Sequence, residues 1–429
     1  MSRRFFVAFF PVFVLTTFLC RAQETQKLSL ADAERIAIQN HPRIQAARHL
    51  AAAAQAQVTQ AESAYYPQAV GNLTGAEAEH DSRISAGALN NPIIYDRYAY
   101  GVSVEQLVTD FGRTHELVKS SGLHAQAQKE NVTTSRADVL LNVDRAYYSV
   151  LRAQAVLKVA EDTVKNRQLV ADQITALEKN KLKSGLDVSF ANVDLAQAQL
   201  LLIQAQNGVE ASYADLSAAL GYSDEKTFTL AEEAVPPAPS PNVSELISQA
   251  LQNRPELIGG RLDVRSAQTY ATAERDLWFP TISAVGTAGL APYREEPLGS
   301  RYAAAGFDVN IPLFNGHQFG ALRAEANAQA QAQEQYLRDL QNGIIREVHK
   351  AWLEANAEFQ RLSVTQQLLS QATQALDLAQ QRYKLGLSSI IELSQAQLNM
   401  TQAEITQASA KYDYEDAISA LNFQVGVSH

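Results

Sequence analysis

The chain of 429 residues is internally duplicated, and this duplication limits the folds that it can adopt. Residues within 28–50 match residues within 242–264 at an offset of 213, so that Ser29 corresponds to Asn242, Pro42 to Pro255 and the aromatic-proline run 65–67 to 278–280. Further along, the match continues at smaller offsets: 183–186 is similar to 384–387, and 213–220 to 414–421. A repeat of this length predicts two copies of one structural unit. We place them at 23–221 and 242–425, joined by a proline-rich connector at 222–241 and followed by a tail at 426–429.

Each unit is predicted to contain one very long helix that reverses into a second. Proline is absent from 93–235 and from 313 to the end, and apolar residues recur at alternating steps of four and three from Val139 to Val164, which is a heptad pattern. A helix from Gly112 to Gly185 would extend about 105 Å, and the return helix over 186–220 about 50 Å. Glycine readily adopts the left-handed conformation that follows a helix end. We therefore expect helical hairpin tips at Gly185 and Gly386.

Two β-like stretches precede each long helix. They lie at 66–79 and 98–108 in the first unit and at 281–290 and 301–313 in the second, so we expect hairpins at about 66–108 and 281–313. Each stretch has about ten residues, the length of a tilted membrane-spanning strand. A soluble β-hairpin is the alternative, and the N-terminus argues against it.

The N-terminus has the pattern of a secretory signal. Arg3 and Arg4 precede about fifteen apolar residues, and small residues at −3 and −1 predict cleavage after Ala22, so that 1–22 is a signal peptide. A membrane anchor is disfavoured because the run is short and contains Pro11. Cys20 is an alternative lipidation site, although Leu19 before it does not suit one. Removal of residues 1–22 takes away Arg3, Arg4, Arg21 and Cys20. The net charge then changes from −10 to −13, and no cysteine remains.

Several classes of function are disfavoured. An acidic chain is a poor partner for nucleic acid. No later run reaches about 18 apolar residues, so we expect no transmembrane helix. The eight histidines are scattered without metal-ligand spacing, and neither a GxSxG nor a Walker motif is present. The run at 109–113 has the letters of a kinase DFG motif, but no glycine-rich loop accompanies it. We expect no metal site, no cofactor and no enzymatic activity.

The combination of an export signal, four strands and long helical hairpins suggests a pore. Four strands cannot close a membrane barrel, because the smallest barrels have about eight. Several chains would have to share one, and three chains would supply twelve strands. The helices would then project as a tube about 100 Å long. The expected fold is mixed α and β, with duplicated helical hairpins and four transmembrane strands per chain.

The motifs resemble those of a known family. Residues 28–42 and 243–257 are similar to the duplicated opening motif of the TolC-like outer membrane efflux proteins, and 182–186 and 383–387 to their periplasmic tips. The resemblance covers about 28–425. It implies a homotrimer in the bacterial outer membrane with a 12-stranded barrel and a periplasmic tunnel. It also implies a periplasmic adaptor and a proton-driven or ABC inner-membrane transporter, for efflux of drugs, toxic compounds or metal ions. Type I protein secretion is the alternative, and a soluble periplasmic coiled-coil adaptor is a more remote one.

The resemblance also assigns roles to residues near the tips. Residues expected to meet the adaptor are Ser184, Gly185, Leu186, Leu385, Gly386 and Leu387. Glu392 and Gln395 occupy the positions of an acidic ring at the tunnel entrance, so one charge is kept and one is lost; Asp194 is a further candidate. Tyr383 matches a gate tyrosine, but its expected carboxylate partner falls at Ala191 and an expected arginine at Ser388. We therefore predict a gate of different composition. The alternative for Glu392 is a solvated surface carboxylate.

Overall fold

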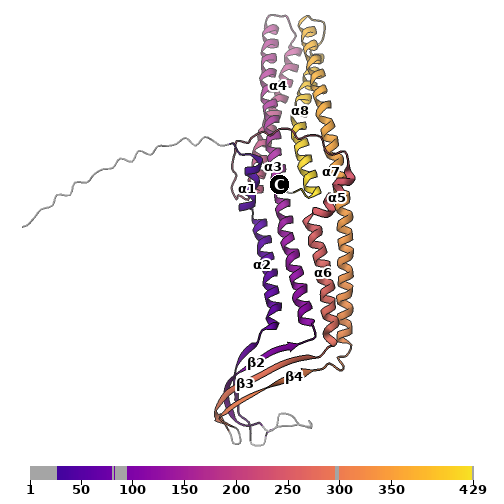
Figure 1. Ribbon diagram of the computed structural model, residues 1–429. Coiled ribbons are helices and arrows are strands. Elements are labelled where there is room, and N and C mark those ends of the chain that lie inside the picture. Colours follow the sequence, from indigo (N-terminus) through magenta and orange to yellow (C-terminus); the bar gives the residue numbers. More distant parts are fainter. Residues whose placement is uncertain (1–26, 80–81, 83–93, 295–298, 428–429) are drawn as a thin grey trace, which may run out of the picture.

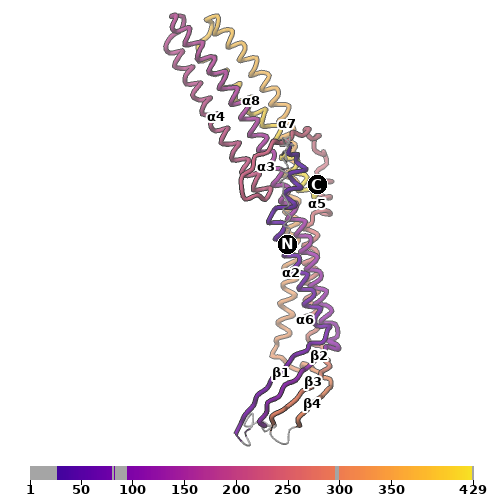
Figure 2. Tube along the Cα trace, turned by 90° about the vertical axis from the view of Figure 1, so that its left-hand side faces the viewer, coloured from indigo at the N-terminus to yellow at the C-terminus, as the bar shows by residue number. Residues whose placement is uncertain are grey.

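The computed structural model describes residues 27–79, 82, 94–294 and 299–427. The predicted signal peptide at 1–22, with Cys20, and the last two residues of the predicted tail lie outside this part of the chain. The molecule is long and narrow, with a β-sheet at one end and the tips of two helical hairpins at the other (Figure 1). In Figure 2 the helical segment beyond the middle of the molecule leans away from the axis of the lower segment.

The elements follow the same order in the two halves of the chain. The first half contains α1 (Leu30–Asn40), α2 (Pro42–Glu62), β1 (Gln68–Ala76), β2 (Arg97–Thr109), α3 (Arg113–Lys179) and α4 (Gly185–Ala219). The second contains α5 (Val243–Asn253), α6 (Pro255–Arg275), β3 (Thr281–Arg294), β4 (Arg301–Asn310), α7 (Gln318–Lys384) and α8 (Ile390–Val425). Pro42 and Pro255 each stand at the start of a helix, where proline needs no hydrogen-bond partner for its nitrogen. The short helix before each proline starts at a capping residue, Ser29 or Asn242.

The four strands form one antiparallel sheet in the order β1-β2-β3-β4. The pairs β1–β2 and β3–β4 are the predicted hairpins. The central pair β2–β3 joins the two halves, with Val102 opposite Ala288 and Val104 opposite Gly286. All ten residues of β4 are exposed, and large apolar side chains such as Leu73 and Phe307 are 83% and 75% exposed. The predicted strands are confirmed, and their apolar side chains lack cover within one chain.

The helices α3 and α7 each have 67 residues, so each runs about 100 Å and links the sheet to the tips. Near the sheet they pack with α2 and α6, and toward the tips they pack with α4 and α8 (Figure 1). The predicted heptad lies inside: Val139, Val143 and Val150 are at most 1% exposed. This buried seam holds α3 against α1 and α4. A helix of this length gains its stability from packing rather than from intrinsic propensity.

The connector 222–241 lies against the middle of the helices, held by aromatic side chains. The Tyr147 hydroxyl lies 2.6 Å from the carbonyl oxygen of Ala231, and Trp352 donates its indole N–H to the carbonyl of Ser240 at 2.7 Å. The Tyr414 hydroxyl donates to the carbonyl of Pro237 at 2.5 Å. Backbone groups of an extended segment need such partners when no sheet satisfies them.

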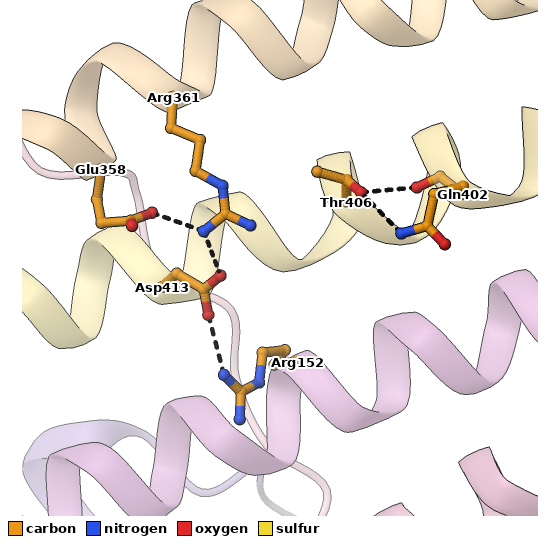
Figure 3. Close-up of polar contacts among 6 residues, drawn as sticks. All are labelled: Arg152, Glu358, Arg361, Gln402, Thr406 and Asp413. Atoms are coloured by element: carbon orange, nitrogen blue, oxygen red, sulfur yellow. Dashed lines mark hydrogen bonds and ion pairs between the residues drawn. The ribbon is translucent and has the colours of Figure 1, made fainter. Parts of the chain in front are cut away.

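An ionic network joins the two halves at the same level (Figure 3). Asp413 of α8 accepts hydrogen bonds from Arg152 of α3 at 3.0 Å and from Arg361 of α7 at 3.1 Å. Arg361 also contacts Glu358, one turn earlier on α7, at 3.0 Å. One carboxylate thus binds two guanidinium groups from different hairpins. A shared partner of this kind fixes the second hairpin against α3 with defined geometry.

The helix α4 differs from expectation, because it is long and apolar enough to cross a membrane by length and composition alone. Alanines at 191, 198 and 205 bury one side of it, whereas Leu186, Val193 and Leu200 are 52–65% exposed. Both sets recur every seven residues and therefore occupy two opposite faces. The rule of an uninterrupted apolar run missed this helix because polar residues separate the two faces. Its exposed apolar face has no cover within the described chain.

Candidate functional site at the helical tips

The first tip is formed by Lys181 and not by Gly185. Helix α3 ends at Lys179, Lys181 adopts a left-handed φ of 61°, and the amide of Leu182 donates to the carbonyl of Leu177 at 2.9 Å. Ser184 then caps α4 in a capping box with Asp187, so Gly185 is already the first residue of the helix. The prediction of a left-handed Gly185 was wrong, because Ser184 starts the new helix before the glycine is reached.

The second tip is formed by Gly386, as predicted. Helix α7 ends at Lys384, and Gly386 has a φ of 73°. The amide of Leu387 donates to the carbonyl of Arg382 at 2.8 Å, which is the hydrogen bond of a Schellman turn. Ser389 then precedes α8.

The two tips align along the chain at an offset of 205 residues. The left-handed residue Lys181 corresponds to Gly386, the N-cap Ser184 to Ser389, and Asp187 to Glu392. The helix ends Lys179 and Lys384 differ by the same 205. The match of 183–186 with 384–387 had an offset of 201 and was therefore displaced by one helical turn. Helices rich in alanine and glutamine match almost equally well after a shift of four residues, since the same face is presented.

Tyr383 has a carboxylate partner, although not at the expected position. Its hydroxyl donates to Asp187 Oδ1 at 3.4 Å, and the Lys183 ammonium lies 3.6 Å from the centre of its ring. Ala191, where the partner was expected, is buried in the local core. Burial, followed by the charge of Asp187, raises the pKa of Tyr383 to about 12. Partial burial opposes ionisation of Asp187, but hydrogen bonds from Ser184 and the charge of Lys183 hold its pKa below the usual value. The contact is thus a neutral phenol donating to an ionised carboxylate.

Asp194 makes a second contact of the same kind. The Ser394 hydroxyl of α8 donates to Asp194 Oδ2 at 2.6 Å. Asp194 follows Asp187 by seven residues, so the two carboxylates lie two turns apart on one face of α4. Together they bind α7 and α8 of the second hairpin to α4 of the first. Two hydroxyl–carboxylate hydrogen bonds therefore hold the two hairpins together at the tip.

Glu392 is in an ion pair. Its carboxylate accepts a hydrogen bond from Arg382 Nε at 2.9 Å, and both side chains are about half exposed. Gln395 donates a hydrogen bond to Asn399 of its own helix, at 2.9 Å. Ser388 occupies the position where the family resemblance predicts an arginine. Arg382, on the other side of the turn, supplies a guanidinium instead. The charge of Glu392 is therefore partly offset within the same chain.

The tip surfaces are apolar. Leu186, Leu385 and Leu387 are 65–74% exposed, and Leu182, which sequence reasoning missed, is 69% exposed. Asp187, Arg382 and Ser394 were likewise not predicted from the sequence. The Ser-x-x-Asp spacing of 184–187 is a capping-box signal and could have identified Asp187. Nothing in the sequence pairs Ser394 with a residue 200 positions away.

The sequence and the fold are both similar to those of known proteins. The family model described as outer membrane efflux protein matches 35–222 and 246–427, so the chain belongs to that family. The outer membrane efflux protein BepC of Brucella suis is 23% identical over 368 residues, covering 84% of this chain and 77% of its own length. The outer membrane protein TolC of Vibrio cholerae is 24% identical over 430 residues, covering 97% and 94%. A solved membrane protein from Pseudomonas aeruginosa has the same fold, with a TM-score of 0.79, 21% identity and coverage of 92% and 93%.

The expected family, fold class and outer-membrane location are thereby confirmed. The chain is a TolC-like outer membrane efflux protein with a periplasmic helical extension. This is a family of channels and not of enzymes or of soluble adaptors.

Proposed function

We propose that three copies of this chain assemble into a channel-tunnel that receives substrates from an adaptor and an inner-membrane transporter and releases them outside the cell. The units 23–221 and 242–425 would each contribute one strand hairpin and one helical hairpin. The observation that carries the proposal is that both layers end in open edges. The sheet ends at β1 and β4, and the helical layer near the tips ends at α4 and α7 (Figure 1).

The exposed apolar side chains support closure into a ring. On α4 they include Val193 and Leu200, which are 52% and 60% exposed; on α7 they include Val364 and Leu378, which are 60% and 61% exposed. Packing α4 of one copy against α7 of the next covers both stripes with a head-to-tail interface, which closes into a ring when the rotation suits. Twelve strands would then form the barrel, with outward apolar side chains such as Leu73 and Phe307 in contact with outer-membrane lipid.

The tips supply a surface for an adaptor. Leu182, Leu186, Leu385 and Leu387 project from two adjacent turns, and exposed leucines clustered in this way suit a protein partner. Ser184, Gly185 and Gly386 set the shape of the turns. The substrate is expected to be a drug, a toxic compound or a metal ion, with the choice made by a proton-driven or ABC transporter. With an ABC exporter of proteins, the same channel would serve type I secretion.

The entrance is proposed to be held narrow by the hydroxyl–carboxylate bonds at Asp187 and Asp194. A hydrogen bond to an ionised group contributes about 1.5–3 kcal/mol. The Ser394–Asp194 bond at 2.6 Å fits that range, whereas the Tyr383–Asp187 contact at 3.4 Å is weaker, and three chains would contain three of each. This is enough to favour a closed entrance and small enough for a docked partner to offset.

Planar-bilayer recording tests the proposal. Removing both hydroxyl groups by Tyr383→Phe and Ser394→Ala is expected to raise the single-channel conductance several-fold, because the second hairpin is released from α4. The matched control is Tyr336→Phe with Ser363→Ala, which removes the same groups from α7 away from the tip and should leave the conductance unchanged. No channel activity from the unmodified protein would refute the channel, whereas channels of equal conductance in both double variants would refute only the gate.

A further inference from the structure

A cavity lies between the two helical hairpins beyond the entrance contacts. Helix α3 lines one side and α7 and α8 the other, and the cavity, which is open to solvent, has a volume of about 460 Å³. Tyr383, which contacts Asp187 at the tip, lines one end of it. The volume lies in the range of pockets that hold small molecules.

Two polar side chains with little exposed surface line this cavity. Arg167 of α3 is 9% exposed and Gln397 of α8 is 5% exposed. In the described part of the chain, neither side chain makes a hydrogen bond or an ion pair. Burial lowers the pKa of Arg167 although the charges of Asp194 and Glu404 oppose this effect, so the two carboxylates do not fully compensate its charge. Arg167 and Gln397 therefore both keep free hydrogen-bonding capacity. They come from different hairpins and line one cavity, so a single bound group could satisfy both.

The charge and the apolar area of the lining define what that group would be. Arg167, Lys183 and Lys384 give three positive charges, and Glu404 is the one carboxyl in the lining. Two carboxylates outside the lining offset part of this charge, since Asp194 acts on Arg167 and Asp187 on Lys183. Burial raises the pKa of Glu404, with Asp162 adding to the effect. A net positive cavity in a chain of net charge −10 favours an anion. The rest of the lining includes Ile174, Leu376, Leu393 and Met400, which offer an apolar surface to a hydrocarbon body.

We propose that this cavity binds an anionic amphiphile, a molecule with one sulfate or carboxylate group on a hydrocarbon body. Arg167 and Gln397 both donate charge-assisted hydrogen bonds to the anionic group, because its acceptor oxygens are ionised. Ile174, Leu376 and Met400 contact the hydrocarbon. Because the ligand contacts both hairpins, it stabilises the arrangement in which they lie together.

Bromine quenching of an introduced tryptophan tests the proposal. Leu169, at the mouth of the cavity, is 58% exposed, so Leu169→Trp places a reporter there. The mature full-length protein in zwitterionic lipid nanodiscs is titrated with 11-bromoundecyl sulfate, 11-bromoundecanol and 11-bromoundecyl trimethylammonium. Signals from the chain without Leu169→Trp are subtracted. The sulfate is expected to quench saturably, at a concentration at least ten-fold below that of the other two.

Variants locate the anionic group. In the reporter chain, Arg167→Gln is expected to abolish the preference for the sulfate and Gln397→Leu to weaken it, whereas Arg338→Gln, an exposed arginine on α7, should leave it intact. Equal quenching by all three compounds would reduce the site to an apolar patch and overturn the proposal. Absence of saturable quenching would mean that water fills the cavity. A reporter shielded from acrylamide would mean that a neighbouring subunit fills it, which also contradicts the proposal.

Discussion

At the residue scale, the charge at the proposed entrance would depend on a pair rather than on one carboxylate. Glu392 and Arg382 are joined at 2.9 Å, so a change in either exposes the charge of the other. Arg382→Gln is expected to shift the reversal potential in a salt gradient toward greater cation preference, and Glu392→Gln toward less, because three copies surround the axis. The double variant should return close to the original value, and serves as the control. Unchanged potentials in both single variants would show that the pair lies away from the conducting path.

A second residue-scale feature is the buried acid Asp144 of α3. Burial raises the pKa of Asp144 to about 8, aided by Glu34 of α1 and by Asp416 of α8 and opposed by a hydrogen bond from Ser419. The folded chain keeps this proton after the unfolded chain has lost it. The free energy of unfolding therefore falls as the pH rises from about 4 to about 8. Burial also raises the pKa of Glu415, to about 7, which adds to the fall.

Replacing this acid should reduce the dependence on pH. Asp144→Asn is expected to leave stability near pH 4 almost unchanged and to raise the free energy of unfolding at pH 9 by about 1–3 kcal/mol, because no buried charge forms. Chemical denaturation at the two pH values measures it, with Glu161→Gln at an exposed position as the control. A stabilisation that is equal at both pH values would contradict the burial of an ionisable carboxyl.

At the element scale, the helices and strands could be predicted, but the register between the repeats could not. Proline gaps, the heptad and the capping residues indicated the helices because they act locally. The roles of Gly185 and Gly386 depend on where each preceding helix stops and where the next begins. Ser184 with Asp187 decides this in the first tip and the left-handed Gly386 in the second. The capping box could have identified Asp187, but its contact with Tyr383 and the contact of Ser394 with Asp194 could not be predicted, because both depend on how the two hairpins pack.

The two tip glycines should therefore respond in opposite ways to the same substitution. Gly386→Ala is expected to cost about 1–2 kcal/mol locally, because alanine is strained in the left-handed conformation. Gly185→Ala should stabilise its tip by about 0.5–1 kcal/mol, since alanine is the better helix former. Amide hydrogen exchange over 178–192 and 383–397 measures each tip, with the other as the internal control. Equal destabilisation of both tips would support the one-turn-shifted match of the repeats and contradict this structure.

At the scale of the whole molecule, a single chain leaves an apolar helical face exposed on α4. The buried face of α4 over 191–205 consists of alanines, whereas Leu186, Val193 and Leu200 remain exposed on the opposite face. The sequence predicted twelve strands from three chains but did not identify this helical edge, because apolar residues on two faces of one helix produce no single amphipathic pattern. Only the packing of α4 on α3 shows which face is left over.

Leu200 tests whether a neighbouring chain covers that face. Leu200→Glu places a charge where we propose that α7 of the next copy packs, and should weaken each interface by about 2 kcal/mol, the value of a buried leucine. Native mass spectrometry of the purified protein measures the fraction of trimer. Gln206→Glu adds the same charge at an exposed polar position of α4 and should leave the trimer intact. If both variants lose trimer equally, added charge is the cause and the α4 stripe is not the interface; if neither does, α4 faces solvent or another partner.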